Sequence, residues 1–508
     1  MRIQIVFKLV GQLLLIFATL ILVPFIYGVI FEEAYYSYVV TTLVTAILGG
    51  LGIYYGKESA SYSLRDGFLV VSSLWIISSI LGSMPFWLSG VTPNYEDALF
   101  EAVSGLTATG ASVIPNIDEI PKTFILWRSI MHWVGGMGII VLVIAFLKNL
   151  GADAAHLFNA EASVPRPGVV FPRIKSLAAK LWRIYVFFTV LCFICLLLSG
   201  LNTFDALNMT FSTVATGGFT PHQDGTFLYS DNWYIKITLI VFMTIAGGNF
   251  SVYYNGYSNG MKYLFKDVEF MMYLFILFVG SCITFTGLAF FNDSTPFVPL
   301  FGDALFTYIS MQTGSGFAVA DYDKWPAISQ TALFLSTFLG GCSGSTTGGI
   351  KIIRILILFK SSILWLKKAI HPDIVQIVRF GGKPMQNKWI LMTQQFFFLY
   401  MAIFAVSTLL IAATGIPVGE SMQCVAGILG NVGLAFGQFG PTDSFSTLHP
   451  VAKITCVVDM ILGRLELFTI MVLLLPSFWQ GYFVKQNNVN TKRWKYMNGD
   501  RIKQNTQN

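Results

Sequence analysis

Ten stretches of about 20 mostly apolar residues follow one another along this chain, separated by polar or glycine-rich segments. A stretch of that length can cross the hydrocarbon core of a bilayer as a helix. The first apolar run is too long for a signal peptide and has no small-residue cleavage site before Glu32, so it should remain as a helix. The pattern predicts spans 1 to 10 near residues 9–31, 36–55, 67–90, 123–148, 181–200, 233–255, 269–291, 329–349, 389–414 and 450–477.

The charged residues between the spans predict which ends face the cytoplasm. Lys and Arg gather after spans 2, 4, 6 and 8 and in the carboxyl-terminal tail, whereas Asp and Glu gather in the other connections. The positive-inside rule therefore places both termini in the cytoplasm. The acidic residues on the opposite side either concentrate cations or form an ordinary solvated face.

Composition strengthens this reading, because 55% of the 508 residues are hydrophobic and only 11% are charged. A soluble globular protein usually carries about 25% charged residues. These values exclude a soluble multidomain enzyme, a disordered protein and, despite the net charge of +6, a nucleic-acid binder. The fold class predicted is an all-α polytopic membrane protein whose partner is the lipid bilayer.

An internal repeat is the most informative feature. The segments between spans 3 and 4, 5 and 6, 7 and 8, and 9 and 10 each hold a short helix-compatible stretch followed by a glycine-containing turn. When the four turns are aligned without gaps, Gly110, Gly218, Gly316 and Gly433 fall in one column. We name the turns 1 to 4 by their residues: Thr107, Ala108, Thr109 and Gly110; Ala215, Thr216, Gly217 and Gly218; Thr313, Gly314, Ser315 and Gly316; Gly430, Asn431, Val432 and Gly433.

Four re-entrant turns around one axis would build a ring of backbone carbonyl groups. Non-helical backbone at membrane depth is tolerated only where it lines protein or water. Carbonyl rings can replace the hydration shell of a monovalent cation, and glycine adopts the positive φ angles that such turns require. The turns are therefore predicted to be an ion-selectivity filter.

The repeat also predicts how the chain is organised. Each unit is a membrane helix, a half-helix with a re-entrant P-loop turn, and a second membrane helix, and the four pseudo-repeats surround one pore. Two extra transmembrane helices (1–60) precede repeat 1 (61–160), repeat 2 (161–265), repeat 3 with its intramembrane loop (266–388), repeat 4 (389–480) and a cytoplasmic basic tail (481–508).

These turns, with Arg65-Asp-Gly-Phe68 near one end and Gly463-Arg-Leu-Glu-Leu-Phe468 near the other, resemble the TrkH branch of the Trk/Ktr/HKT superfamily of potassium transporters. The two extra amino-terminal helices favour the TrkH type. The resemblance implies that glycine in all four turns marks potassium selectivity, whereas serine in the first turn marks sodium-preferring relatives. Turn 4 departs most, with Asn431 and Val432, so its carbonyl ring is expected to be asymmetric.

Span 8 contains a glycine-rich run that should break its helix, because each glycine costs about 1 kcal/mol relative to alanine. The run does not match a phosphate-binding loop, since Lys351 is followed by Ile352 rather than by Ser or Thr. A flexible intramembrane gate below the filter is predicted, and the resemblance agrees. The predicted gate residues are Gly340, Gly341, Ser343, Gly344, Ser345, Thr346, Thr347, Gly348, Gly349 and Lys351, together with Arg464.

Arg464 lies with Asp459 and Glu466 in the otherwise apolar span 10. A charge at membrane depth costs at least about 2.5–3.5 kcal/mol and should face a cavity or a partner. Arg464 either pairs with one of these carboxylates or projects into the pore, and the resemblance implies the second role. His132 in span 4 is interpreted as a hydrogen-bonded packing residue rather than as a proton relay.

The predicted function is potassium uptake across a prokaryotic cytoplasmic membrane, driven by the electrochemical gradient. The alternative is a secondary transporter of another cation or an organic solute that binds at the broken helix, although such folds usually have two inverted halves. No nucleophile or metal-ligand motif was found, so the chain is predicted not to be an enzyme and to need no cofactor. The resemblance further implies a homodimer and a cytoplasmic nucleotide-binding regulatory ring of the TrkA type, and channel-like conduction and symport both stay open.

Overall fold

The computed structural model describes residues 3–57, 64–138, 174–291, 296–372, 377–381 and 383–479. Within these residues six helices are long and apolar enough to cross a membrane, or seven if the bent pair α10 (Trp233–Ala246) and α11 (Phe250–Asn259) is one span. The predicted helical membrane fold is confirmed. The ten predicted spans, however, are not ten continuous helices.

Six predicted spans form long helices, and each ends within two residues of its predicted end. Their apolar runs are long enough to continue through a single glycine pair, such as Gly49 and Gly50 in the second helix. They are α1 (Ile3–Ile30), α2 (Tyr36–Tyr55), α3 (Leu64–Ser89), α8 (Ile174–Leu198), α12 (Val268–Phe291) and α16 (Asn387–Ala412).

The other four spans are interrupted, although a break was predicted only in span 8. Span 6 bends by 92° between α10 and α11, where Gly247 and Gly248 stand. Glycines also stand at the ends of α5 (Lys122–Gly136), α14 (Ala327–Phe338) and α18 (Pro450–Arg464), because glycine is a poor helix former. After α18 the chain continues as α19 (Glu466–Met471) and α20 (Pro476–Trp479), and predicted residues 139–148 of span 4 lie outside the described part.

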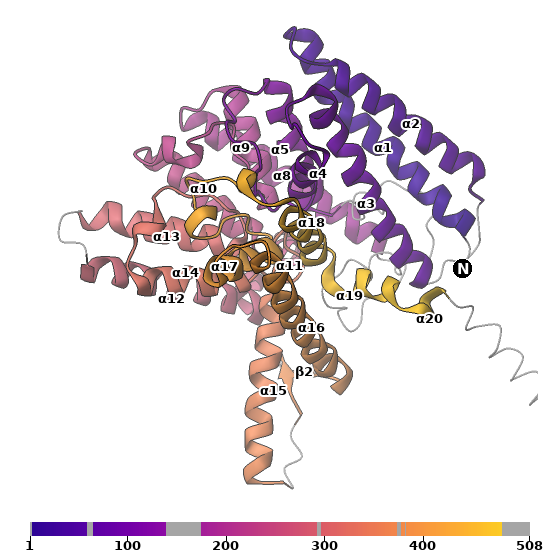
Figure 1. The fold of residues 1–508 in the computed structure, drawn as a ribbon. Coiled ribbons are helices and arrows are strands. Elements are labelled where there is room, and N and C mark those ends of the chain that lie inside the picture. Colours follow the sequence, from indigo (N-terminus) through magenta and orange to yellow (C-terminus); the bar gives the residue numbers. More distant parts are fainter. Residues whose placement is uncertain are drawn as a thin grey trace, which may run out of the picture.

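Four short helices precede the four turns and pack in cyclic order. They are α4 (Tyr95–Leu106), α9 (Thr203–Ala215), α13 (Phe297–Thr313) and α17 (Val418–Leu429). Each one packs against the interrupted helix of the preceding unit: α9 on α5, α13 on α10, α17 on α14, and α4 on α18. The last contact joins the two ends of the series, so the four units close into a ring (Figure 1).

The first two helices form a hairpin on the outside of this ring. Helices α1 and α2 pack along each other, and α1 also contacts α3 and α5 of the first unit (Figure 1, indigo). Glycines permit the close approach, because a side-chain carbon at Gly11 would lie 2.6 Å from the carbonyl oxygen of Gly49. The hairpin therefore extends the first unit and leaves the centre of the ring to the four turns.

The remaining elements lie at the periphery. Helix α15 (Ile352–Ile370) projects from the body and is followed by an antiparallel pair of two-residue strands, β1 (Arg379–Phe380) and β2 (Lys383–Pro384) (Figure 1). The predicted tail 481–508 and the predicted boundary between residues 160 and 161 lie outside the described residues. Short 3-10 helices are η2 (Gly225–Tyr229), η3 (Met261–Lys266), η4 (Tyr322–Lys324), η5 (Gly437–Phe439), η6 (Phe445–Thr447) and η7 (Val472–Leu474).

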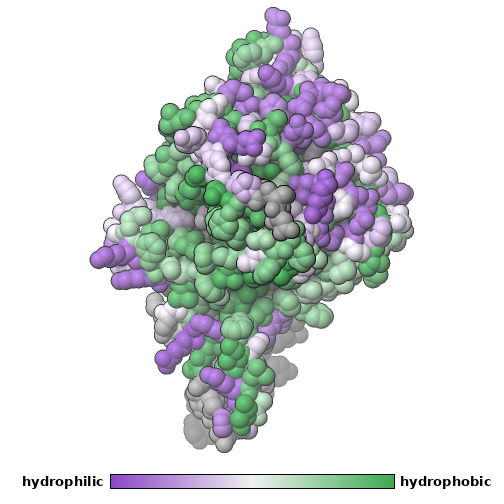
Figure 2. Space-filling view, turned by 90° about the vertical axis from the view of Figure 1, so that its left-hand side faces the viewer, coloured by the Kyte–Doolittle hydropathy of each residue, from purple (hydrophilic) through white to green (hydrophobic). Residues whose placement is uncertain are grey.

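The surface has the polarity expected of a protein in a bilayer. Figure 2 shows hydrophobic residues over most of the middle of one face, with hydrophilic residues gathered mainly above them. Large apolar side chains of α12 and α16 are exposed, among them Phe278 at 65%, Phe290 at 83% and Leu409 at 70%. Lipid can cover such side chains at no cost in hydration, which explains how a chain with so few charges avoids aggregation.

Candidate functional site

The four turns share one backbone conformation at two positions. The aligned glycines all have positive φ, at 87° for Gly110, 95° for Gly218, 64° for Gly316 and 80° for Gly433. The residues two positions earlier do so as well, and they are Ala108 (50°), Thr216 (55°), Gly314 (68°) and Asn431 (53°). Positive φ costs a residue with a side chain roughly 1–2 kcal/mol. Four turns with the same unusual pattern at the same aligned positions form one structural element used four times.

The turns meet in a closed ring of glycines and carbonyl groups. A side-chain carbon built on each aligned glycine would run into the carbonyl oxygen of the neighbouring turn: Gly217 for Gly110, Ser315 for Gly218, Val432 for Gly316 and Thr109 for Gly433. The order of contacts is turn 1 to turn 2, to turn 3, to turn 4 and back to turn 1. Any side chain in this column would therefore displace backbone at the centre of the molecule.

Hydrogen bonds tie the four loops that follow the turns into an outer collar, in the same cyclic order. The collar surrounds a hollow of about 100 Å³ that is bordered by the four aligned glycines and by Asp224 and Asp443. The collar bonds join Ile117 N to Gln223 Oε1 (2.9 Å), Thr226 Oγ1 to Ala318 O (2.6 Å), the Tyr322 hydroxyl to Ala435 O (2.7 Å) and Phe445 N to Ser112 O (2.9 Å).

The side chains that support the turns follow a twofold pattern instead. In turns 1 and 3 two hydroxyl groups bond within the turn, Thr107 to Thr109 at 2.7 Å and Thr313 to Ser315 at 2.9 Å. In turns 2 and 4 the residue at the first positive-φ position reaches out of the turn. Thr216 Oγ1 lies 3.3 Å from Thr346 Oγ1 in the glycine-rich loop. Asn431 Nδ2 donates to Thr109 Oγ1 (2.8 Å) and to Met460 O (3.0 Å). The expected asymmetry of the carbonyl ring at turn 4 stays a prediction.

Three of the acidic residues predicted on the outer side form ion pairs with buried basic side chains. Asp97 lies 2.5 Å from Lys453 Nζ, Asp303 lies 2.7 Å from Lys236 Nζ, and the carboxylate of Glu101 lies 2.6 Å from Arg128 Nε. Asp97, Asp205, Asp303 and Glu420 occupy one aligned column, thirteen residues before the turn glycines. The aligned column of acidic residues was therefore visible in the sequence. It could have indicated that lysines within the apolar spans are their partners.

His222 forms a titratable contact within the collar. Its Nδ1 lies 3.2 Å from Asp118 Oδ1 and its Nε2 lies 3.0 Å from Asp205 Oδ2, so the ring stands between two carboxylates from two units. Burial alone would lower the pKa of His222, but the hydrogen bonds and charges of Asp205 and Asp118 raise it above its usual value. At the opposite side of the collar, burial and neighbouring carboxylates raise the pKa of Asp323 to about 6.

The glycine-rich run forms a loop between α14 and α15 that lies against turns 2 and 4. Its two ends pair side by side, Gly340 N donating to Ile350 O (2.9 Å) and Ile350 N donating to Phe338 O (3.1 Å). A side-chain carbon at Gly348 would lie 2.7 Å from both Asn431 Oδ1 and Gly430 O. Thr346, Gly348 and Gly349 of the loop thus lie against turns 2 and 4, and the loop is completed by Gly340, Gly341, Ser343, Gly344, Ser345 and Thr347.

Polar side chains hold this loop in place. Lys351 Nζ donates to the carbonyl and hydroxyl oxygens of Thr347, and Ser343 N donates to the buried Glu269 at 2.5 Å. Arg464 donates to Thr346 O at 2.5 Å and to the carbonyl oxygens of Gly135 and Gly136 at 2.7 Å each. Arg464 therefore links the loop to the end of α5.

Asp459, one of the two carboxylates considered as a partner of Arg464, accepts a hydrogen bond from Ser407 Oγ at 2.8 Å. The side chain of Glu466, the other carboxylate considered as a partner, lies outside the described part of the structure. Within the described residues no group of three or more His, Cys, Asp and Glu side chains could hold a metal ion.

Comparisons with known proteins agree with the resemblance drawn from the turns. The family model "TrkH: Cation transport protein" matches residues 35–481. The Trk system potassium uptake protein TrkH of Vibrio parahaemolyticus is 35% identical over 94% of this chain and all of the relative, and that of Escherichia coli K12 is 34% identical over the same shares. The crystal structure of the potassium transporter TrkH from Vibrio parahaemolyticus matches with a TM-score of 0.86 at 33% identity, over 94% of this chain and all of that one.

Proposed function

Because this chain belongs to the TrkH family of cation transport proteins, we propose that it takes up potassium across the cytoplasmic membrane through the ring of four turns. The observation that carries the proposal is the closed ring, in which each glycine lies against a carbonyl oxygen of the next turn. A transport family also agrees with the expectation that the chain is not an enzyme. The apolar helices and the relatives support a multi-pass protein of the inner membrane.

In this proposal turns 1 to 4 are the selectivity filter. Backbone carbonyl groups replace the water that potassium loses on entry, and glycine leaves the axis open. The helices α4, α9, α13 and α17 end at the turns, so the partial negative charges of their carboxyl ends favour a cation there. An inside-negative potential then supplies about 2.3 kcal/mol per 100 mV for each charge moved inward.

The loop 340–349 and Arg464 are the proposed gate. Arg464 carries a positive charge and donates to the loop at Thr346, and the loop itself lies against turns 2 and 4. A cation leaving the filter would meet both. Opening requires the loop and the guanidinium to move together, because three carbonyl groups hold Arg464 to its present place.

The proposed partners act from the cytoplasmic side. A nucleotide-binding ring of the TrkA type would regulate the gate, and a second copy of the chain would complete a homodimer. Helix α15 supports a contact of this kind, because it projects from the body and exposes Phe359, Trp365 and Leu366 beside the basic Lys367 and Lys368 (Figure 1). Its first turns follow the loop directly, so a partner bound there would act on the gate.

The filter is tested by replacing Gly316 with serine. A hydroxymethyl group at this position would push against Val432 O, so potassium should lose its advantage over sodium. Gly50→Ala is the matched control, because nothing lies within 4 Å of a side-chain carbon there. The measurement is rubidium uptake into proteoliposomes in competition with potassium and sodium. Unchanged ion competition in Gly316→Ser would remove the filter assignment.

The break between α14 and α15 is also compatible with a second function. In that case the chain would be a secondary transporter that binds an organic solute at the loop. Ligands that stabilise the native protein raise its unfolding temperature. Potassium and rubidium should therefore stabilise the purified protein more than sodium or organic solutes do. Stabilisation by an organic solute alone would favour the second function.

A further inference from the structure

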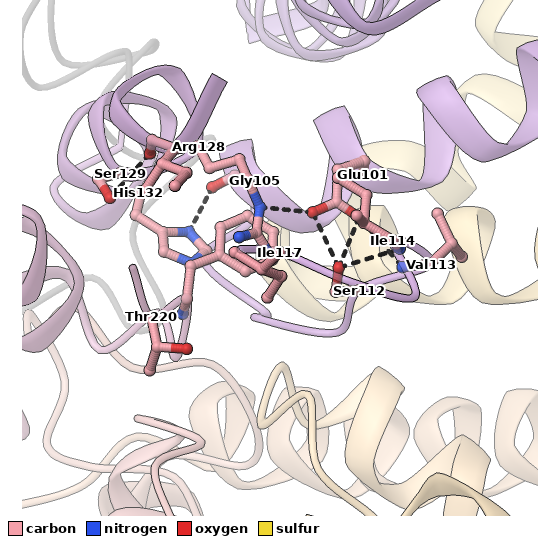
Figure 3. A network of polar contacts seen from close by, with 12 residues as sticks. Glu101, Gly105, Ser112, Val113, Ile114, Ile117, Arg128, Ser129, His132 and Thr220 are labelled. Atoms are coloured by element: carbon pink, nitrogen blue, oxygen red, sulfur yellow. Dashed lines mark hydrogen bonds and ion pairs between the residues drawn. The ribbon is translucent and has the colours of Figure 1, made fainter. Parts of the chain in front are cut away.

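A buried carboxylate stands behind turn 1 and holds three groups at once. Glu101 lies on α4, nine residues before Gly110, and its side chain is fully buried. It receives hydrogen bonds from Ser112 Oγ and from Val113 N, both at 3.1 Å, and it pairs with Arg128 Nε at 2.6 Å (Figure 3). The carboxylate thus joins α4 and α5 to the segment that follows turn 1.

Arg128 extends this network to the residue that follows turn 2 and to the outer hollow above the ring. Its guanidinium carbon lies 3.9 Å from the centre of the Phe219 ring, the residue that follows Gly218. The same side chain borders the outer hollow, together with the four turn glycines. A positive charge at the entrance to a cation pore is tolerable only if it is neutralised, and Glu101 is the carboxylate that contacts it.

His132 completes the network one helical turn after Arg128. Its Nδ1 lies 2.8 Å from Gly105 O (Figure 3), and its Nε2 accepts a hydrogen bond from Phe219 N at 3.2 Å. The imidazole also stacks on the Phe219 ring at 4.2 Å between centroids. Accepting at Nε2 and donating at Nδ1 requires the neutral imidazole with its proton on Nδ1. The backbone of turn 2 is therefore held by the first unit.

In the third unit the backbone N–H that follows the turn glycine is bonded within the same unit. Phe317 occupies the column of Phe219, and its N–H donates at 2.7 Å to Ser310 Oγ of its own unit. Ser212 stands in the column of Ser310, but its hydroxyl has no hydrogen-bond partner among the described residues. In the column of Glu101 the other units carry Met209, Thr307 and Cys424. The carboxylate and its arginine are thus specific to the junction between turns 1 and 2.

We propose that Glu101, Arg128 and His132 are positioning residues that set the geometry of turn 2 from the first unit, and that Glu101 also neutralises Arg128 at the outer mouth. This inference rests on the proposed function of the turns as a potassium filter. It assigns two separable roles. The His132 bond and the Arg128 stack orient turn 2, whereas the charge of Glu101 keeps the entrance from repelling cations.

The electrostatic role is tested first, with Glu101→Gln. This variant leaves the charge of Arg128 uncompensated beside the hollow, so potassium uptake should fall at least about tenfold, equivalent to 1.4 kcal/mol. The defect should shrink when an impermeant salt such as N-methyl-D-glucamine chloride raises the ionic strength from about 0.01 to 0.1 M, because the screening length falls from about 30 to 10 Å. Adding Arg128→Met to Glu101→Gln should restore uptake by removing the repelling charge.

The orienting role is tested with His132→Phe and His132→Gln. Phenylalanine keeps a ring against Phe219 but cannot accept from its N–H, whereas glutamine retains one donor and one acceptor. Discrimination between potassium and sodium should therefore fall several-fold in His132→Phe and recover in part in His132→Gln. Ser129→Ala is the control, because the Ser129 hydroxyl bonds only to Ile125 O of its own helix among the described residues (Figure 3).

The outcomes separate the inference from the function on which it rests. If the unmodified protein does not prefer potassium in proteoliposomes, the proposed filter itself is wrong. If it does, and the uptake of Glu101→Gln is independent of salt and is not restored by Arg128→Met, the electrostatic role is overturned. Equal ion discrimination in His132→Phe and the unmodified protein would overturn the orienting role. Size-exclusion profiles and unfolding temperatures identify any variant that fails to fold. If Glu101→Gln fails to fold, the uptake of the double variant decides: uptake that does not depend on salt supports the electrostatic role, and uptake that rises with salt overturns it.

Discussion

Turns 1 and 3 and turns 2 and 4 have the same backbone but different support. In turns 1 and 3 hydroxyl groups bond within the turn, although Thr109 of turn 1 also accepts a hydrogen bond from turn 4, so turn 3 is the more self-contained of the two. In turns 2 and 4 Thr216 and Asn431 reach outward, the first to the glycine-rich loop and the second to turn 1 and α18. The backbone repeats four times at the aligned glycines, whereas the side-chain support differs between the two pairs of turns, and the glycine-rich loop lies against turns 2 and 4.

The difference separates two tasks that a gated filter must perform. A self-contained turn keeps its shape when the surroundings move, which suits a rigid coordination ring. A turn that bonds to a movable loop transmits that movement, because coupling needs a contact that differs between two states. We therefore expect changes in turns 1 and 3 to alter ion selectivity, and changes in turns 2 and 4 to alter gating as well.

The largest effect should follow from releasing the loop from its anchor. Arg464→Ala removes three hydrogen bonds to carbonyl groups, each worth about 1.5–3 kcal/mol when one partner is charged. Only the bond to Thr346 O joins Arg464 to the loop, so the closed state should lose up to about 3 kcal/mol and the ratio of open to closed pores should rise up to about 150-fold. Single-channel recording of reconstituted protein measures this ratio as open probability.

Arg464→Lys distinguishes how the gate works. Lysine keeps the charge but cannot present the guanidinium fork to three carbonyl groups. If Arg464 acts as an electrostatic plug, the lysine variant should stay closed; if it acts as a latch, the variant should open as the alanine variant does. An open probability that changes in neither variant would argue against a gate at this position.

A smaller and more selective effect should separate the two kinds of turn. Thr216→Val cuts the bond to Thr346, whereas Thr313→Val cuts the hydroxyl pair inside turn 3, and each bond is worth about 1 kcal/mol. The first variant should change open probability several-fold with little change in the ratio of potassium to sodium permeability. The second should change that ratio with little effect on gating. The same response in both variants would show that the two kinds of turn do not differ in function.

The smallest effect concerns the collar, where the loops after turns 1 and 2 meet at His222. Since Asp205 and Asp118 raise the pKa of His222, its contribution to stability is complete below about pH 6.5 and is lost as the pH rises through the raised pKa. The ring is more than a third exposed, so this contribution should stay below about 1 kcal/mol. The unfolding temperature of the unmodified protein should therefore fall between pH 6 and pH 8, and that of His222→Gln should fall less.

Thr226→Val is the matched control for the collar. Its buried hydroxyl ties the loops after turns 2 and 3 through Ala318 O and does not titrate in this range. The variant should lower the unfolding temperature equally at each pH. A pH profile of His222→Gln identical to that of the unmodified protein would show that the charged histidine does not hold the collar.

Much of the fold follows from features that a sequence displays directly. Apolar runs located the long helices, because a bilayer selects for length and polarity alone. The aligned glycines located the turns, since positive φ with a carbonyl group alongside admits almost no other residue. The prediction of continuous helices was wrong at spans 4, 6 and 10, because an apolar run has the same hydrophobic pattern whether or not the chain bends within it.

For this protein the sequence by itself determined the membrane setting, the four turns and the break at the glycine-rich loop, because each depends on local composition. Only the tertiary structure decided which groups meet across the ring: Glu101 with Arg128, Asp97 with Lys453, His132 with Phe219, and Arg464 with Thr346. The physical reason is that a charge looks the same in a sequence whether water or a buried partner neutralises it. The closure of the fourth unit on the first brings those partners together.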